Sequence, residues 1–519
     1  MSKSRPLRST PIDGARDPYT GVDYNLGFHI HSYDLDLDYN AGPNHLNATA
    51  VLAIENYREL KTLTVDLASS LRVSRVTLTG HGQASTQPEL LEIRRYRHSG
   101  NKLHVTFVNE LPADLVFDLT VKYSGNPRPL RSPWGEVGWE ETDEGALVAG
   151  QPNGAPSWFP CDDTPDEKAR YRTRITTHRD VTAVATGDLV SEKASGVKIT
   201  REFVVDYPMS TYLAAVYIGP FTHEDLRPAT VGRKEVPVGA WLPSGTPEAK
   251  QVRERFHHDF RAQSEMVEAY SQMFGAYPFP AYEVVVTSEE MEIPLEAQAM
   301  SMFGCNHADG NSTWERLIAH ELSHQWFGNS VGLVEWRDIW LNEGFACYAE
   351  WLWFEHSQQI PAAHHAWVHY RKLLQKPQDL LLADPGTAAM FDDRVYKRGA
   401  LTVHALRMML GDKAFFPLVE RWTTEHKMGL VETRDLENLV ASVLVEHRLC
   451  ASAEEASERT SAFFDAWLRA YELPDFPLPS PDVQTNGSAE AAPLNLTDAD
   501  FAALPAGTSV DDELSLIHI

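Results

Sequence analysis

The stretch that decides the fold is His320-Glu321-Leu322-Ser323-His324, followed after eighteen further residues by Glu343 in the run Trp340-Leu341-Asn342-Glu343-Gly344. Two His four positions apart lie on one face of a helix, so both imidazoles can reach one metal ion. Glu343, on a second expected helix, completes a set of two nitrogens and one carboxylate. Such a set leaves one of zinc's four positions open for water, as in catalytic sites. The sequence therefore predicts one catalytic Zn²⁺ per chain, bound by His320, His324 and Glu343.

The residues around both segments narrow this interpretation. Residues 314–319 and 325–329 extend the motif into an apolar-flanked helix that ends at a Gly. Residues 320–329 and 340–346 resemble the gluzincin aminopeptidases of peptidase family M1, the group of aminopeptidase N and leukotriene hydrolase. The resemblance covers roughly residues 25–473. It implies a zinc-dependent aminopeptidase that hydrolyses N-terminal amino acids from peptides with a zinc-activated water.

Two further residues are assigned to catalysis. Glu321 follows His320 and cannot share its face fully, so we expect it to be the general base that takes the water proton. Tyr396, in the run Val395-Tyr396-Lys397-Arg398-Gly399, resembles the family's Tyr-x-Lys-Gly segment, which implies that its hydroxyl stabilises the oxyanion. Arg398 stands where Lys is usual, and this departure leaves the assignment of Tyr396 intact.

An aminopeptidase must also recognise a free amino group, for which a carboxylate is the simplest partner. Relatives use a Gly-x-Met-Glu-Asn strand, and the corresponding Ile293-Pro294-Leu295-Glu296-Ala297-Gln298 retains only the Glu. Glu296 is the expected anchor, with Glu292 as an alternative in another register. A second amine contact in relatives comes from a Gln-x-Glu or Gln-x-Gln segment. The resemblance carries this role to Gln151 and Asn153 of Gln151-Pro152-Asn153.

Metal-ligating histidines normally donate their other ring nitrogen to a carboxylate or a carbonyl. Glu350 lies seven residues after Glu343, and so on the same helical face, which makes it the candidate partner. His364 and His365 lie on a polar helical pattern. We interpret them as surface residues and not as ligands.

Hydrophobic periodicity divides the chain and predicts a multidomain α+β fold. Alternating apolar residues, as in Tyr33, Leu35, Leu37 and Tyr39, indicate strands and predict an N-terminal antiparallel β domain over residues 25–222. Helical periodicity begins with one expected helix over residues 252–274 and predicts a thermolysin-like, mainly helical zinc metallopeptidase domain over residues 223–473.

The two ends of the chain lack sustained periodicity. We expect residues 1–24 to form a flexible leader and residues 474–519 to form a disordered tail rich in Pro, Ala, Asp and Ser. Larger relatives continue into a helical domain of a few hundred residues. The chain is therefore interpreted as a short form without that domain, and we expect an open cleft that tolerates longer peptides.

Composition excludes several classes of partner. A formal net charge of −27, from 46 basic and 73 acidic residues, argues against nucleic acid and anionic lipid. The apolar stretches are far shorter than the roughly 20 residues that span a bilayer. Residues 1–16 do not resemble a secretory signal, and the four Cys are scattered without a CxxC pair. These features predict a cytoplasmic protein that acts on peptides, with no nucleic acid and no membrane as partners.

Three other functions stand as alternatives. A zinc endopeptidase without amine anchoring follows if Glu296 is misassigned. A noncatalytic scaffold with the family's fold is disfavoured because the ligands, Glu321 and Tyr396 are all present. Epoxide hydrolysis, as in the leukotriene branch, is disfavoured because Phe391 stands where that branch carries another tyrosine.

Overall fold

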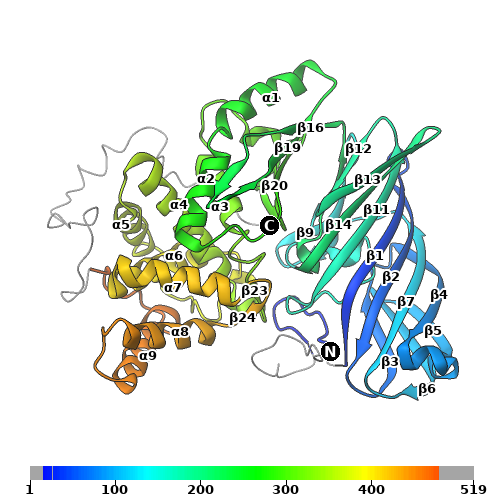
Figure 1. The fold of residues 1–519 in the computed structure, drawn as a ribbon, viewed down its shortest axis with the longest axis horizontal. Helices are drawn as coiled ribbons and strands as arrows, with labels where there is room; N and C mark the ends of the chain where they lie inside the picture. The colour runs from blue at the N-terminus through cyan, green and yellow to red at the C-terminus, as the bar shows by residue number, and fades with distance from the viewer. Residues whose placement is uncertain (1–15, 26, 479–519) are drawn as a thin grey trace.

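The computed structural model describes residues 16–25 and 27–478 of the chain. A domain of long strands lies beside a domain in which helices predominate (Figure 1). The predicted fold class, an N-terminal β domain followed by a mainly helical domain, is confirmed. Within the described residues, no helix has the length and apolar character needed to cross a membrane.

The first domain is built on a seven-stranded sheet in the order β13-β14-β11-β1-β2-β7-β4. Its neighbours are antiparallel except for β1 and β11, which pair in parallel. The inward residues of β1 are buried as the alternation predicts, with Leu35 at 0 % exposure. The strands are β1 (Phe28–Asn40), β2 (His45–Asn56), β4 (Leu71–His81), β7 (Leu115–Gly125), β11 (Lys168–His178), β13 (Asp188–Ser195) and β14 (Lys198–Ser210).

Two smaller sheets complete this domain. The first consists of β3 (Leu60–Asp66), β6 (Lys102–Leu111) and β5 (Ile93–Ser99). The second consists of β12 (Thr182–Ala185), β15 (Val216–Gly219), β10 (Ala146–Ala149), β9 (Gly135–Glu141) and β8 (Leu130–Ser132). Short 3₁₀ turns are η1 (Gly82–Thr86), η2 (Pro88–Leu91), η3 (Ala155–Ser157) and η4 (Thr211–Leu213). The second sheet matters most for the site, because Gln151 lies just beyond the end of β10, after Gly150, and Trp134 lies in the β8–β9 turn.

The second domain contains a five-stranded sheet in the order β16-β19-β20-β22-β21. Strand β21 is a short edge strand, antiparallel to β22, and it carries Glu296. The strands are β16 (Phe221–Asp225), β19 (Val238–Pro243), β20 (Tyr282–Val286), β22 (Met300–Phe303) and β21 (Leu295–Ala297). Two small pairs are β17 (Ala229–Val231) with β18 (Lys234–Val236) and β23 (Gly332–Leu333) with β24 (Leu430–Val431).

Helices make up the rest of the second domain. They are α1 (Pro247–Asp259), α2 (Gln263–Phe274), α3 (Glu315–Ser323), α4 (Trp340–Gln358), α5 (Ala362–Leu373), α6 (Asp393–Leu410), α7 (Asp412–Glu425), α8 (Thr433–Glu446) and α9 (Ala453–Leu468). The 3₁₀ turns are η5 (Cys305–His307), η6 (Trp336–Asp338) and η7 (Thr387–Ala389). The single helix predicted over 252–274 is wrong, since the chain breaks between α1 and α2. Phe260 leaves the helical path and packs on Phe256 and Phe303, which buries its ring.

Helices α4 and α6 touch through their backbones at Gly344 and Gly399. A Cβ added to Gly344 would lie 2.8 Å from the Cα of Gly399, so only glycine permits this approach. The contact sets the distance between Glu343 on α4 and Tyr396 on α6. Close packing of these two helices therefore positions two of the predicted site residues.

Three expectations about exposure are modified by the structure. In the expected leader, residues 16–24 pack against other elements, with Tyr19 only 5 % exposed, while residues 1–15 lie outside the described residues. Of the expected tail, Phe476 packs on Trp367, and residues 479–519 are outside the described part. The interpretation of His365 as a surface residue is wrong, because its ring is buried against Phe354. The apolar neighbour comes from α4, which a helical pattern in one segment does not reveal.

Candidate metal and substrate site

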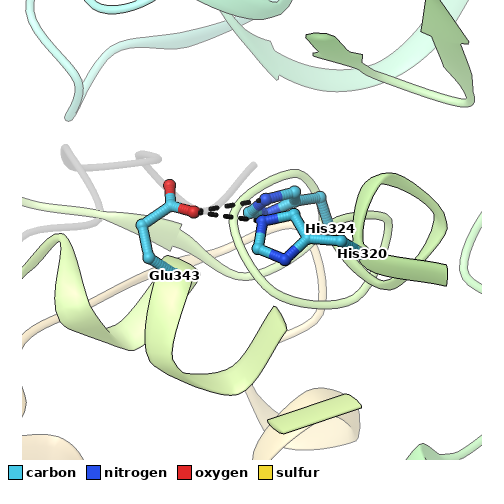
Figure 2. Close-up of side chains that lie close together, drawn as sticks. All are labelled: His320, His324 and Glu343. Atoms are coloured by element: carbon cyan, nitrogen blue, oxygen red, sulfur yellow. Dashed lines mark ion pairs between the residues drawn. The ribbon is translucent and has the colours of Figure 1, made fainter. Parts of the chain in front are cut away.

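The three predicted metal ligands meet at one point. Glu343 Oε2 lies 3.4 Å from His320 Nε2 and 3.5 Å from His324 Nε2 (Figure 2). One potential ligand atom from each residue lies within 4.8 Å of the others, and all three side chains are buried. Burial raises the pKa of Glu343, but the two imidazoles outweigh this effect and lower it to about 2. Two imidazole nitrogens and an ionised carboxylate at this spacing fit a zinc ion with one open position.

Hydrogen bonds at the far side of each imidazole leave its Nε2 facing the metal position. Glu350 Oε1 lies 2.7 Å from His320 Nδ1, and the carbonyl of Phe327 lies 3.0 Å from His324 Nδ1. Arg316 also donates to Glu350 at 3.3 Å. Although burial raises the pKa of Glu350, Arg316 and neighbouring cations hold it well below its usual range. The carboxylate predicted to support a metal ligand is thus ionised and in contact with His320.

Glu321 and Tyr396 line the same pocket, which opens to solvent. The ring of Tyr396 lies roughly parallel to that of His320, with 6.1 Å between the centroids. Burial raises the pKa of the Tyr396 hydroxyl, so this group is a proton donor at neutral pH. Burial also raises the pKa of Glu321, although both imidazoles oppose the shift. A carboxylate and a protonated hydroxyl therefore flank the metal position.

The two candidate anchors for an amino group differ in position. Glu296 lines the pocket, and Gln151 Nε2 donates to its Oε1 across 2.6 Å. Burial raises the pKa of Glu296 to about 7, with His324 opposing the shift. Glu292 is exposed, and Asn153 is not among the pocket's lining residues. The structure thus brings Glu296 and Gln151 together and leaves Glu292 and Asn153 outside.

Two residues that sequence reasoning missed hold the strand of Glu296 against the metal helix. Gln325 accepts the N–H of Ala299 at 2.7 Å and donates to the carbonyl of Ala297 at 3.1 Å. Asn329 donates to the same carbonyl at 3.0 Å. Both side chains are fully buried. Their place as polar residues among Trp326, Phe327 and Gly328 just after the motif is the signal that could have identified them.

A third missed residue comes from the first domain. Lys168, on β11, donates to the carbonyls of Asn329 at 3.1 Å and Ser330 at 3.0 Å. Burial lowers the pKa of this lysine to about 7. The turn that follows the metal helix is therefore fixed from the β domain, which ties the site to the relative position of the two domains.

Arg398, the departure from the family's Lys, points away from the pocket. Its guanidinium donates to backbone carbonyls at the end of α9 and just beyond it, including Trp467 at 2.9 Å, Ala470 at 2.6 Å and Tyr471 at 2.9 Å. A planar group with five N–H donors satisfies several carbonyls at once, which a lysine ammonium cannot match. Arg398 thus stabilises the packing of α9 on α6, and Tyr396 still lines the pocket.

Comparison with known proteins identifies the family. Residues 29–213 match the model of the peptidase M1 N-terminal domain, and residues 258–467 match the peptidase family M1 domain. A crystal structure of the M1 zinc metallopeptidase from Deinococcus radiodurans has a TM-score of 0.76 and 27 % identity, covering 89 % of this chain and 99 % of that chain. A mutant of that enzyme, solved with a Tyr-Ser-Ala substrate, has a TM-score of 0.75 and 26 % identity over the same shares of both chains.

Curated relatives are longer than this chain. Human endoplasmic reticulum aminopeptidase 1 is 26 % identical over 476 residues, which is 85 % of this chain and 48 % of that protein. The chain spans about half or less of the length of the curated relatives it matches. The zinc cofactor predicted from the motif is confirmed by the ligand cluster and by the zinc enzymes that share the fold. With both domain models matched in order along one continuous fold, the chain belongs to peptidase family M1.

Proposed function

We propose that this chain is a zinc-dependent aminopeptidase that removes N-terminal amino acids from peptides. One observation carries the proposal: a partly buried carboxylate, Glu296, shares a pocket with the metal ligands. A carboxylate beside the reacting centre is the natural partner of a peptide's α-ammonium group. The aminopeptidases among the relatives support the same reaction.

The chemistry divides among the residues of the pocket. His320, His324 and Glu343 would hold the zinc ion. Bound zinc supplies a Lewis acid that polarises a carbonyl and makes water more acidic. Glu321 accepts the proton of the attacking water and later passes it to the leaving amine. The hydroxyl of Tyr396 donates to the oxyanion that develops on the carbonyl.

Restriction to the chain end follows from the pairing of Glu296 and Gln151. The amide of Gln151 occupies one carboxylate oxygen and leaves the other for the substrate's ammonium group. A substrate whose amine is acetylated cannot pair with this charge, so the second carboxylate oxygen of Glu296 would lose its water without gaining an ammonium partner. Cleavage within a chain is disfavoured for the same reason. The cytoplasmic location that the Cys pattern suggested remains part of this proposal, and all four thiols are free.

The test is the initial rate on aminoacyl anilides and on their N-acetylated counterparts. Each is measured as prepared, after chelation, and after zinc is returned, with Glu321→Gln as the control that should keep zinc and lose turnover. Chelator-sensitive hydrolysis of only the free-amine substrates is expected. Equal hydrolysis of both sets would favour an endopeptidase without amine anchoring. A chain that binds zinc but cleaves neither set, nor a longer peptide, would favour the noncatalytic scaffold.

A further inference from the structure

Residues 16–24, here called the clasp, lie between the two domains (Figure 1, blue trace beside the N label). On the β-domain side, Asp23 pairs with Lys102 at 3.0 Å. On the other side, Tyr24 packs with Val334 and Leu430 in a small apolar cluster of the second domain. The clasp therefore contacts both halves of the molecule.

The clasp also holds the loop that precedes α6. The hydroxyl of Tyr19 donates to the carboxylate of Asp384 and accepts the N–H of Gly386 at 3.1 Å. The hydroxyl of Thr387 donates to the carbonyl of Pro18 at 3.1 Å. Tyr19 is 5 % exposed, so its ring is packed as well as bonded. Three hydrogen bonds thus tie residues 384–387 to the clasp.

A second element of the β domain reaches the same loop. Trp134, in the turn between β8 and β9, donates its indole N–H to the carbonyl of Thr387 at 2.8 Å. The same ring meets Phe391 edge to face, with 5.6 Å between centroids. Trp134 is buried at 4 % exposure. The clasp therefore holds the loop at residues 384–387, and Trp134 holds it at Thr387 and Phe391.

The loop matters because its last residues form part of the site. Phe391 lines the pocket that contains Glu296 and the metal ligands. Asp392 then caps α6 by accepting the N–H of Arg394 at 2.9 Å, and Tyr396 follows within the first turn. A displaced loop would move the pocket wall first and the start of α6 second.

We propose that Tyr19 and Trp134 are positioning residues that hold Phe391 as a rigid wall for the side chain of the substrate's first residue. The apolar lining residues Ile293, Leu295 and Phe391 face this space, so the favoured first residue is large and apolar or aromatic. The preference rests on the proposed aminopeptidase function, whereas the bracing of the loop does not.

Tyr19→Phe is a mild probe of this arrangement. It retains the ring and removes only the hydroxyl, and Asp384 is exposed, so its carboxylate regains water when the partner is lost. Trp134→Phe likewise keeps an aromatic ring and removes the N–H that holds Thr387. A matched control is Tyr123→Phe, which removes a buried hydroxyl that donates to Trp158 at 2.9 Å inside the β domain, far from the loop in sequence.

Two measurements test the proposal on the full chain. The first is hydrogen exchange of the peptide covering residues 384–391, with a peptide from α8 as reference. Faster exchange in Tyr19→Phe and Trp134→Phe, but not in Tyr123→Phe, is expected because the N–H of Gly386 loses its acceptor in the first variant. Unchanged exchange in both variants would overturn the bracing, whether or not the protein is active.

The second measurement is the ratio of kcat/KM for a Phe anilide to that for an Ala anilide. The ratio is expected to exceed one and to fall roughly three- to tenfold in both variants, mainly through KM, with little change in Tyr123→Phe. An equal loss on both anilides would indicate general damage and would overturn the specificity role. If the unaltered protein cleaved neither anilide, the proposed function would fail while the exchange experiment still decided the bracing.

Discussion

Gln151 of the β domain donates its side-chain amide to Glu296 of the catalytic domain across 2.6 Å. This bond joins residues 145 positions apart, so neither domain contains the proposed amine site by itself. Lys168 reinforces the same junction from β11 by binding the turn after the metal helix. Substrate selection is therefore coupled to how the two domains are held together.

Glu296→Gln should weaken recognition of the free amine. The isosteric amide keeps the shape of the side chain but removes the charge that pairs with the ammonium group. We expect kcat/KM on aminoacyl anilides to fall roughly 10- to 150-fold, the equivalent of about 1.5–3 kcal/mol for a hydrogen bond to a charged group. Glu292→Gln is the matched control, since Glu292 is exposed and does not line the pocket. A larger loss in the control would transfer the anchor to Glu292.

Glu350→Gln should weaken zinc binding without removing a ligand. The carboxylate holds His320 by its Nδ1 at 2.7 Å, and loss of such a partner typically lowers metal affinity about 10- to 100-fold. The dissociation constant is measured by competition with a chromophoric chelator. Glu425→Gln, at an exposed position on α7, should bind zinc as the unaltered chain does. Equal affinity in both variants would show that Glu350 does not support the metal.

His404 should make the fold less stable in acid. Burial lowers its pKa from 6.5 to about 3, and its Nδ1 accepts the hydroxyl of Tyr348 at 3.1 Å. The unfolded chain binds a proton near pH 6.5 and the native chain does not. The contribution of His404 is thus complete above pH 6.5, and stability falls by up to about 1.4 kcal/mol per unit as the pH drops towards 3.

The variant His404→Gln retains an acceptor for Tyr348 and cannot titrate in this range. Its free energy of unfolding, measured with urea between pH 8 and pH 4, should depend on pH with a slope smaller by about one proton. At pH 8 the imidazole is neutral in both the folded and the unfolded chain. The difference in free energy of unfolding between the variant and the unaltered chain at this pH therefore reports packing alone and serves as the internal control. Parallel slopes for the two proteins would contradict the assignment.

Arg398→Met should destabilise the catalytic domain. The change leaves several carbonyls around the end of α9 without their donor in a partly buried setting. We expect the free energy of unfolding to fall by about 2–4 kcal/mol. Arg398→Lys should recover only part of this loss, because one ammonium cannot replace the planar guanidinium. Arg434→Met, at a half-exposed position on α8, is the control and should change stability little. An unchanged melting temperature in Arg398→Met would show that Arg398 does not stabilise the packing of α9 on α6.

Local patterns in the sequence were sufficient for the metal cluster and the fold class. His320 lies in α3 and His324 caps its C-terminal end, so helical geometry sets their separation. An alternating strand such as β1 has its buried face set by the pleat. The predicted position of Glu350 was also local, since it lies two turns along α4 from Glu343. Hydrophobic periodicity did not reveal the break between α1 and α2, because the apolar repeat continues across it.

Contacts between distant segments needed the tertiary structure. The sequence by itself determined the residues of the metal cluster and the order of the two domains, because the motif segments and the change from strand to helical periodicity are local patterns along the chain. Only the fold decided that Glu296 and not Glu292 lines the pocket, that Gln151 reaches it while Asn153 does not, and that Tyr19 is buried against the loop before α6. The physical reason is that these contacts depend on how sheets and helices from different parts of the chain pack together. The hydrophobic periodicity of one segment carries no information about which distant residues will contact it.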